Sequence, residues 1–185
     1  MEMSAPWIAR AALALFLGLL LWAAVHDLRR FRIPNLLNAL LLALFFPVVL
    51  LLPAEVDWLS HLGAAGLILV LGLVLFCFGW LGAGDVKIMT ALALWAGFGR
   101  LFDLMVFVTL AGGLLSLVLW TLRRKAARAL PAGFAPAPDP LADPELETDF
   151  AVPHLLRTRY VPYGVAIALG AMLAAPRLPA FALAF

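Results

Sequence analysis

The sequence predicts an all-α polytopic membrane protein with about six transmembrane helices. Of its 185 residues, 65% are hydrophobic and only 13% are charged, and the mean hydropathy is +1.06. Several apolar runs approach the roughly 20 residues that a helix needs to cross about 30 Å of hydrocarbon. The net charge of +2 is too small to indicate nucleic-acid binding, so no nucleic-acid partner is expected.

The first four spans are separated by polar or glycine-containing breaks. Residues 7–25 form the first run, which is expected to be a retained span rather than a signal peptide. Pro34 suits the first turn of the second helix, which is expected to continue to residue 52. The third run covers residues 61–81 and the fourth residues 86–98. The fourth run covers only about 20 Å as a helix, so its start is expected inside the membrane.

The remaining chain contains two more spans and a long connection. Glycines after residue 96 predict a break before a fifth span at residues 101–122. Residues 123–159 are rich in Pro, Ala and acids and are predicted to be a cytoplasmic loop within a single membrane-embedded domain, 1–185. The last span is expected from Pro162 to about residue 175, followed by an apolar tail at the outer interface. Cys77, the only cysteine, cannot form an internal disulfide and is expected to be buried.

The basic residues lie mostly on one side of this six-helix layout. The positive-inside tendency makes that side cytoplasmic and places both termini outside. The regions of Asp27, Asp85 and Pro162 then meet at the cytoplasmic membrane face. Ten of the thirteen Lys and Arg residues are on this side: Arg29, Arg30, Arg32, Lys87, Arg123, Arg124, Lys125, Arg128, Arg157 and Arg159.

Two carboxylates on that face form a candidate catalytic pair. Asp27 closes the first span, and Asp85 opens the fourth after a turn in which Gly82 and Gly84 leave room for a substrate. A pair that shares one proton can activate water with one member and protonate the leaving group with the other. Helix polarity favours the charge on Asp85, at a helix N-terminus, and the proton on Asp27, at a C-terminus. Arg29 and Arg30 would reverse this assignment if they stabilise an ionised Asp27, and the pair titrates as a unit. Neither an HExxH nor a GxSxG motif occurs, so no metal or serine mechanism is expected.

Other interpretations of these residues stay open at this point. Asp27 is equally consistent with a surface charge neutralised by Arg30, and Asp85 with a helix N-cap. Lys87 is two positions from Asp85 and is expected to be a membrane-surface anchor on a different helix face. A small transporter or proton-relay subunit and a non-catalytic scaffold for pilus or secretion assembly are the alternative functions. The outer halves of the spans are almost wholly apolar, which argues against a relay.

Three segments together resemble the type IV prepilin peptidases, a family of GxGD intramembrane aspartic proteases. Residues 82–87 resemble the GxGD motif, Asp27 with residues 32–35 resembles the first-aspartate region, and residues 161–166 resemble the late Pro-Tyr/Phe-Gly segment. The resemblance implies that Asp27 and Asp85 are the catalytic pair. The residues expected to bind substrate are Gly82, Gly84, Pro162, Tyr163, Gly164 and Asn35.

The resemblance also implies an activity and a location. The expected reaction is cleavage of the basic leader of type IV, Flp-like prepilins or pseudopilins, at the cytoplasmic face of a bacterial inner membrane, with lipid around the enzyme and no cofactor. The chain resembles the short, CpaA- or TadV-like form, which is associated with Flp pili, tight adherence and protein secretion. Its first cytoplasmic loop is only about eight residues long and lacks the paired cysteines of bifunctional members, so N-methyltransferase activity is not expected.

Overall fold

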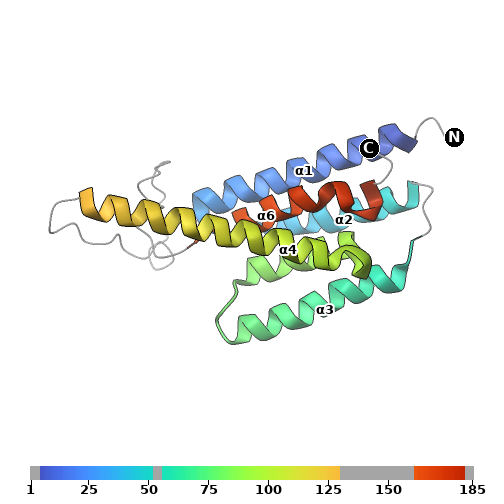
Figure 1. The fold of residues 1–185 in the computed structure, drawn as a ribbon. Helices are drawn as coiled ribbons and strands as arrows, with labels where there is room; N and C mark the ends of the chain where they lie inside the picture. The colour runs from blue at the N-terminus through green and yellow to red at the C-terminus, as the bar shows by residue number, and fades with distance from the viewer. Residues whose placement is uncertain (1–4, 52–55, 130–160, 182–185) are drawn as a thin grey trace.

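The computed structural model describes residues 5–51, 56–129 and 161–181, and these ranges contain helices and connecting segments but no strand. The stretches Pro6–Arg30, Trp58–Cys77 and Ala83–Lys125 are long and apolar enough to cross a membrane. The prediction of an all-α membrane protein is therefore confirmed. Figure 1 shows the elements, which are α1 (Ala5–Arg30), α2 (Asn35–Leu51), α3 (Trp58–Cys77), α4 (Ala83–Ala129), α6 (Tyr163–Ala174), and the 3₁₀ turns η1 (Ala175–Arg177) and η2 (Pro179–Phe181).

Helix α4 consists of two helical segments that meet at Gly97, where the chain reverses direction (Figure 1). Gly97 has φ 59°, in the left-handed region that favours glycine. The first turn of α3 satisfies the backbone groups at this break. His61 Nδ1 donates to the Leu94 carbonyl oxygen (2.6 Å), and the Phe98 N–H donates to Ser60 Oγ (2.9 Å). The predicted break between the fourth and fifth runs is confirmed.

Two predicted features of the chain are wrong. The predicted loop starts at residue 123, but α4 continues to Ala129 because Arg, Lys and Ala are strong helix formers and basic residues suit the C-terminal end of a helix. Residues 130–159 of that loop lie outside the described residues. Cys77 is exposed rather than buried, since α3 ends there and packs chiefly against α4.

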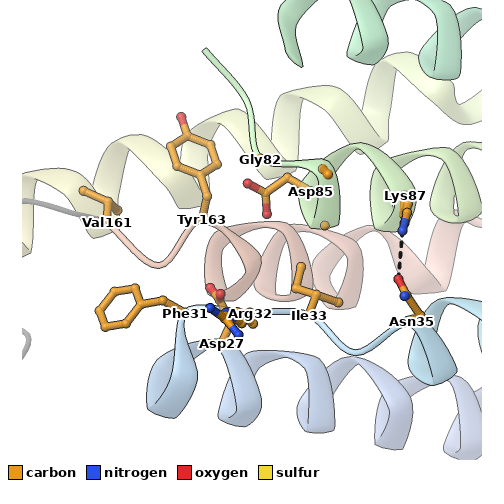
Figure 2. A pocket seen from close by; sticks show the side chains of 12 residues that line it. Asp27, Phe31, Arg32, Ile33, Asn35, Gly82, Asp85, Lys87, Val161 and Tyr163 are labelled. Atoms are coloured by element: carbon orange, nitrogen blue, oxygen red, sulfur yellow. Dashed lines mark hydrogen bonds between the residues drawn. The ribbon is translucent and has the colours of Figure 1, made fainter. Parts of the chain in front are cut away.

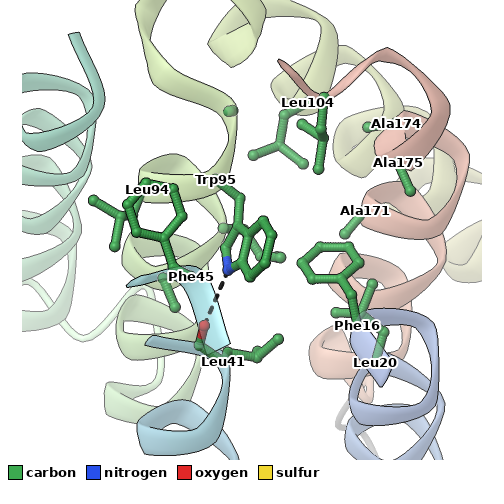
Figure 3. Close-up of a cluster of buried hydrophobic side chains, with 14 of the residues drawn as sticks. Phe16, Leu20, Leu41, Phe45, Leu94, Trp95, Leu104, Ala171, Ala174 and Ala175 are labelled. Atoms are coloured by element: carbon green, nitrogen blue, oxygen red, sulfur yellow. Dashed lines mark hydrogen bonds between the residues drawn. The ribbon is translucent and has the colours of Figure 1, made fainter. Parts of the chain in front are cut away.

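The core lies between α1, α2, α6 and the first segment of α4, and Trp95 is at its centre (Figure 3). The Trp95 ring contacts Phe16, Phe45 and Phe181, with ring centroids 4.9, 5.4 and 5.2 Å away. Its Nε1–H donates to the carbonyl oxygen of Leu41 (3.0 Å). Phe181 is fully buried, and its ring packs beside Phe16 and Trp95. The chain up to Phe181 therefore does not form the predicted tail along the outer interface.

The bundle has two chemically different ends. The C-terminal end of α1 and the N-terminal ends of α2, α4 and α6 lie at one end, while the Gly97 turn and η2 lie at the other (Figure 1). The basic residues follow this division among the described residues. The first end carries Arg29, Arg30, Arg32 and Lys87, and the second carries Arg10, Arg100 and Arg177.

Candidate active site

A cavity of about 380 Å³ lies at the end of the bundle where α1, α2, α4 and α6 meet (Figure 2). Both candidate carboxylates belong to its wall, although Asp27 and Asp85 are far apart in sequence. The lining residues are Asp27, Phe31, Arg32, Ile33, Asn35, Gly82, Ala83, Gly84, Asp85, Lys87, Val161 and Tyr163. The structure thus brings together the three segments that the sequence analysis singled out.

Asp27 lies in the last turn of α1 and is only 5% exposed. Its Oδ2 accepts a hydrogen bond from the backbone N–H of Val165, at 3.2 Å. Val165 is the third residue of α6, and its N–H is one of the donors that a helix leaves unpaired at its start. The N-cap residue, Pro162, has no side chain that could accept it, so Asp27 acts as the capping carboxylate of α6 from another helix. Asp27 therefore does not form the surface ion pair with Arg30 that one interpretation predicts.

Gly164 allows this close approach of α6 to Asp27. A Cβ atom at position 164 would lie 2.8 Å from both Cγ and Oδ2 of Asp27 and 3.0 Å from Cδ1 of Ile33. No side chain fits there without displacing the carboxylate. Glycine at this position therefore couples the start of α6 to the position of Asp27.

Asp85 is the third residue of α4 and is partly buried. Its carboxylate lies close to Gly82, where an added Cβ would be 3.2 Å from Oδ2. Gly84 packs against Ile33, with an added Cβ 3.4 Å from the Ile33 Cβ. Asp85 is thus inside the first turn rather than at the N-cap position. Asp27 lies in the last turn of α1 and also at the N-terminal end of α6, so helix polarity alone does not assign the proton to either acid.

The link between α1 and α2 supplies cavity residues that the sequence analysis missed. Phe31 has φ 50°, and its N–H donates to the Asp27 carbonyl oxygen (2.9 Å), which ends α1 in a tight turn. His26 Nδ1 donates to the Arg32 carbonyl oxygen (2.6 Å) and holds the link against α1. A left-handed phenylalanine has no sequence signal, because glycine or asparagine is the usual residue there. The turn directs Ile33 between Gly84 and Gly164.

Lys87 also lines the cavity, so the prediction that it faces another side from Asp85 is wrong. Its Nζ donates to Asn35 Oδ1 at 2.8 Å, as the dashed line in Figure 2 shows. Residues two apart do point to different sides of a helix. The four-carbon stem of lysine overcomes this difference, because the N-terminal end of α2 lies beside the first turns of α4.

The six residues predicted to bind substrate occupy different positions around the cavity. Four of them line it, and two lie behind its wall. Pro162 is buried at the start of α6, and Gly164 packs against Asp27. The lining members are Asn35, Gly82, Gly84 and Tyr163.

A bundle of apolar helices that places two carboxylates in the wall of one cavity has the groups that acid–base hydrolysis uses. Residues 14–119 match the family model of the type IV leader peptidases, which is more than half of the chain. The protein therefore belongs to the type IV leader peptidase family and is a membrane peptidase. The matched range includes both Asp27 and Asp85. Neither a curated protein nor a solved structure matches the chain.

Proposed function

We propose that this protein is a prepilin leader peptidase, an aspartic endopeptidase that cleaves the leader of type IV, Flp-like prepilins at the cytoplasmic face of a bacterial inner membrane. The observation that carries this proposal is the convergence of Asp27 and Asp85 on one cavity at the basic end of the bundle. Membership in the leader peptidase family supports the same substrate class. Prepilins and pseudopilins both present a basic leader before an apolar helix.

The cavity provides what acid–base hydrolysis of a peptide needs. One carboxylate takes a proton from water, which attacks the carbonyl carbon of the scissile bond. The other gives its proton to the nitrogen atom as the carbon–nitrogen bond breaks. The volume of about 380 Å³ is within the usual range of ligand pockets, and Gly82 and Gly84 leave their part of the wall without side chains. This chemistry uses no metal and no cofactor.

The proposed membrane arrangement has six spans within one domain, 1–185. They are α1, α2, α3, the two segments of α4, and α6. The positions of the basic residues support a cytoplasmic cavity with both termini outside. Figure 1 shows that α4 extends past the cavity end of the bundle, and in the proposed arrangement this extension is cytoplasmic.

We further propose that the enzyme does not N-methylate its product. Only residues 31–34 connect α1 to α2, at the place where bifunctional members of the family carry an inserted segment with paired cysteines. This short turn supports the assignment to the Flp-associated form. Mass spectrometry of the mature pilin would then show a free α-amino group, and a methylated terminus would contradict this part of the proposal.

Co-expression with candidate prepilins tests the proteolytic function. Asp27→Asn and Asp85→Asn are each expected to abolish leader removal, because either change leaves a single titratable carboxylate. Asp103→Asn is the matched control, since Asp103 pairs with Arg100 at the opposite end of the bundle (3.3 Å). Leader removal is measured by mass spectrometry of the pilin, with insertion checked by membrane fractionation. Full processing by both site variants would exclude the aspartic mechanism and favour a scaffold.

A further inference from the structure

Two cations share the cavity wall with the two acids. Lys87 Nζ donates one hydrogen bond, to the neutral amide oxygen of Asn35 (2.8 Å). Within the described residues, neither Lys87 nor Arg32 forms an ion pair with a carboxylate. Both side chains line the cavity. Among the described residues, these two positive charges are therefore not held in ion pairs.

A charge count for the cavity indicates what it would attract. With the one shared proton that the proposed mechanism requires, the two carboxylates carry a charge of −1 and Lys87 with Arg32 contributes +2, so the lining then has a net charge of +1. An ammonium group has three donors, and Asn35 accepts only one of them. The remaining donors can bind an oxygen acceptor through charge-assisted hydrogen bonds.

The position of Lys87 relative to Asp27 and Asp85 indicates where in the cavity a bound oxygen acceptor would lie. Figure 2 shows Lys87 and Asn35 on one side of Asp85, and Tyr163 on the other. An oxygen atom held by Lys87 would lie beside the carboxylates rather than between them.

We propose that Lys87 binds an oxygen atom of the peptide being cleaved, either a backbone carbonyl or a carboxylate, and that Asn35 positions Lys87 rather than contacting the peptide. This inference rests on the proposed peptidase function and adds a binding residue to it. The competing explanation is that the Lys87–Asn35 hydrogen bond only holds α2 against α4.

Two substitutions separate these explanations. Lys87→Met removes the charge and its donors and keeps the length of the side chain. Asn35→Asp keeps an acceptor for Lys87 and strengthens the bridge, but its negative charge offsets the positive charge that would attract an oxygen atom of the peptide. If the bridge only holds the helices together, Asn35→Asp preserves it and cleavage is normal. If Lys87 binds the peptide, both variants lose affinity for it. Lys125→Met, at the far end of α4, is the matched control for loss of a lysine charge.

The measurement uses the full-length protein in lipid nanodiscs with a reporter precursor, a short basic leader followed by an apolar helix of about 20 residues. Lys87→Met and Asn35→Asp are expected to raise KM at least about tenfold, because losing a hydrogen bond to a charged group weakens binding by about that factor. The unfolding midpoint is expected to fall slightly for Lys87→Met, which removes the bridge, and not to fall for Asn35→Asp, and kcat is expected to change less than KM in both variants. This reporter is built with one acidic residue beside the cleavage site, and a second reporter has that residue replaced by its amide. With wild type, a raised KM for this reporter identifies a carboxylate ligand, and an unchanged KM identifies a carbonyl.

The outcomes distinguish this inference from the function on which it rests. In one outcome, wild type cleaves the reporter and the Asp27→Asn and Asp85→Asn variants do not, while Lys87→Met and Asn35→Asp show the wild-type KM. The inference about Lys87 is then wrong, and the aspartic mechanism stands. A normal KM for Asn35→Asp alone would assign the pair to helix packing and would also overturn the inference. Cleavage by the aspartate variants would instead remove the proposed function and the inference with it.

Discussion

Gly164→Ala is the smallest change that should disable the cavity without removing either acid. The new Cβ would lie 2.8 Å from Cγ and Oδ2 of Asp27, whereas unstrained contacts between heavy atoms of this kind are about 3.5 Å. The carboxylate must therefore move by about 0.5–1 Å. Its hydrogen bond from the Val165 N–H is already 3.2 Å long and would be lost by such a shift.

The two consequences of this shift differ in size. Displacing a catalytic group by about 1 Å can lower a rate by about 10²-fold, so we expect cleavage to fall by about that factor. Overpacking costs about 1–3 kcal/mol of folding stability, and the better helix propensity of alanine offsets up to about 1 kcal/mol of it. Most of the protein should remain folded, and the loss should be in kcat.

Two glycines provide matched controls for this substitution. An added Cβ at Gly18 meets nothing within 4 Å, so Gly18→Ala should cleave like wild type. An added Cβ at Gly170 would overlap the backbone of Val108, away from the cavity, so Gly170→Ala should lower stability and leave the kcat of the folded fraction unchanged. Rates are measured on protein in nanodiscs, with unfolding followed in parallel. Wild-type cleavage by Gly164→Ala, in a protein that is fully folded, would refute the argument that α6 fixes the position of Asp27.

Two further changes test the glycine turn and the core. Gly84→Leu should abolish cleavage and permit membrane insertion, because an added Cβ would already contact the Ile33 Cβ at 3.4 Å and the rest of the leucine would fill the cavity that Gly84 lines. Insertion and leader removal are measured in the same cells, and normal processing would contradict the need for a small residue at this position. Trp95→Phe removes the hydrogen bond from Nε1–H to the Leu41 carbonyl oxygen and should lower the free energy of unfolding by about 1–3 kcal/mol, with no change in KM. Stability is measured by denaturant titration in detergent, and an unchanged stability would show that this hydrogen bond contributes nothing.

The ends of the helices around the cavity are the part of the structure that local sequence predicts best. The glycine turn before Asp85, Pro34 before α2 and Pro162 before α6 each lie within one residue or so of a helix start in the structure. These signals are local, because proline and glycine restrict or free the backbone at their own positions. Charge asymmetry then places these ends together, which is enough to predict that Asp27 and Asp85 meet.

The contacts that tune the site depend on packing between distant segments, which local patterns do not encode. Lys87 and Asn35 are 52 positions apart, and Val165 and Asp27 are 138 positions apart. The sequence position of Lys87 gives the direction of its Cβ but not the distance to α2, so it was assigned to the wrong environment. The extension of α4 past residue 123 had a local signal in its helix-forming residues, but the prolines further along outweighed it.

The two acids are stabilised in a way that leaves them available for chemistry. Neither Asp27 nor Asp85 forms an ion pair within the described residues; each lies instead at the N-terminal end of a helix, where backbone donors and the helix dipole stabilise negative charge. A guanidinium partner would occupy both oxygen atoms of a carboxylate, whereas the Val165 N–H occupies only Oδ2 of Asp27. A capping N–H can reach a side chain on another helix only if the helix start comes very close. The need for glycine at position 164 is therefore a consequence of holding Asp27 by a backbone donor rather than by a cation.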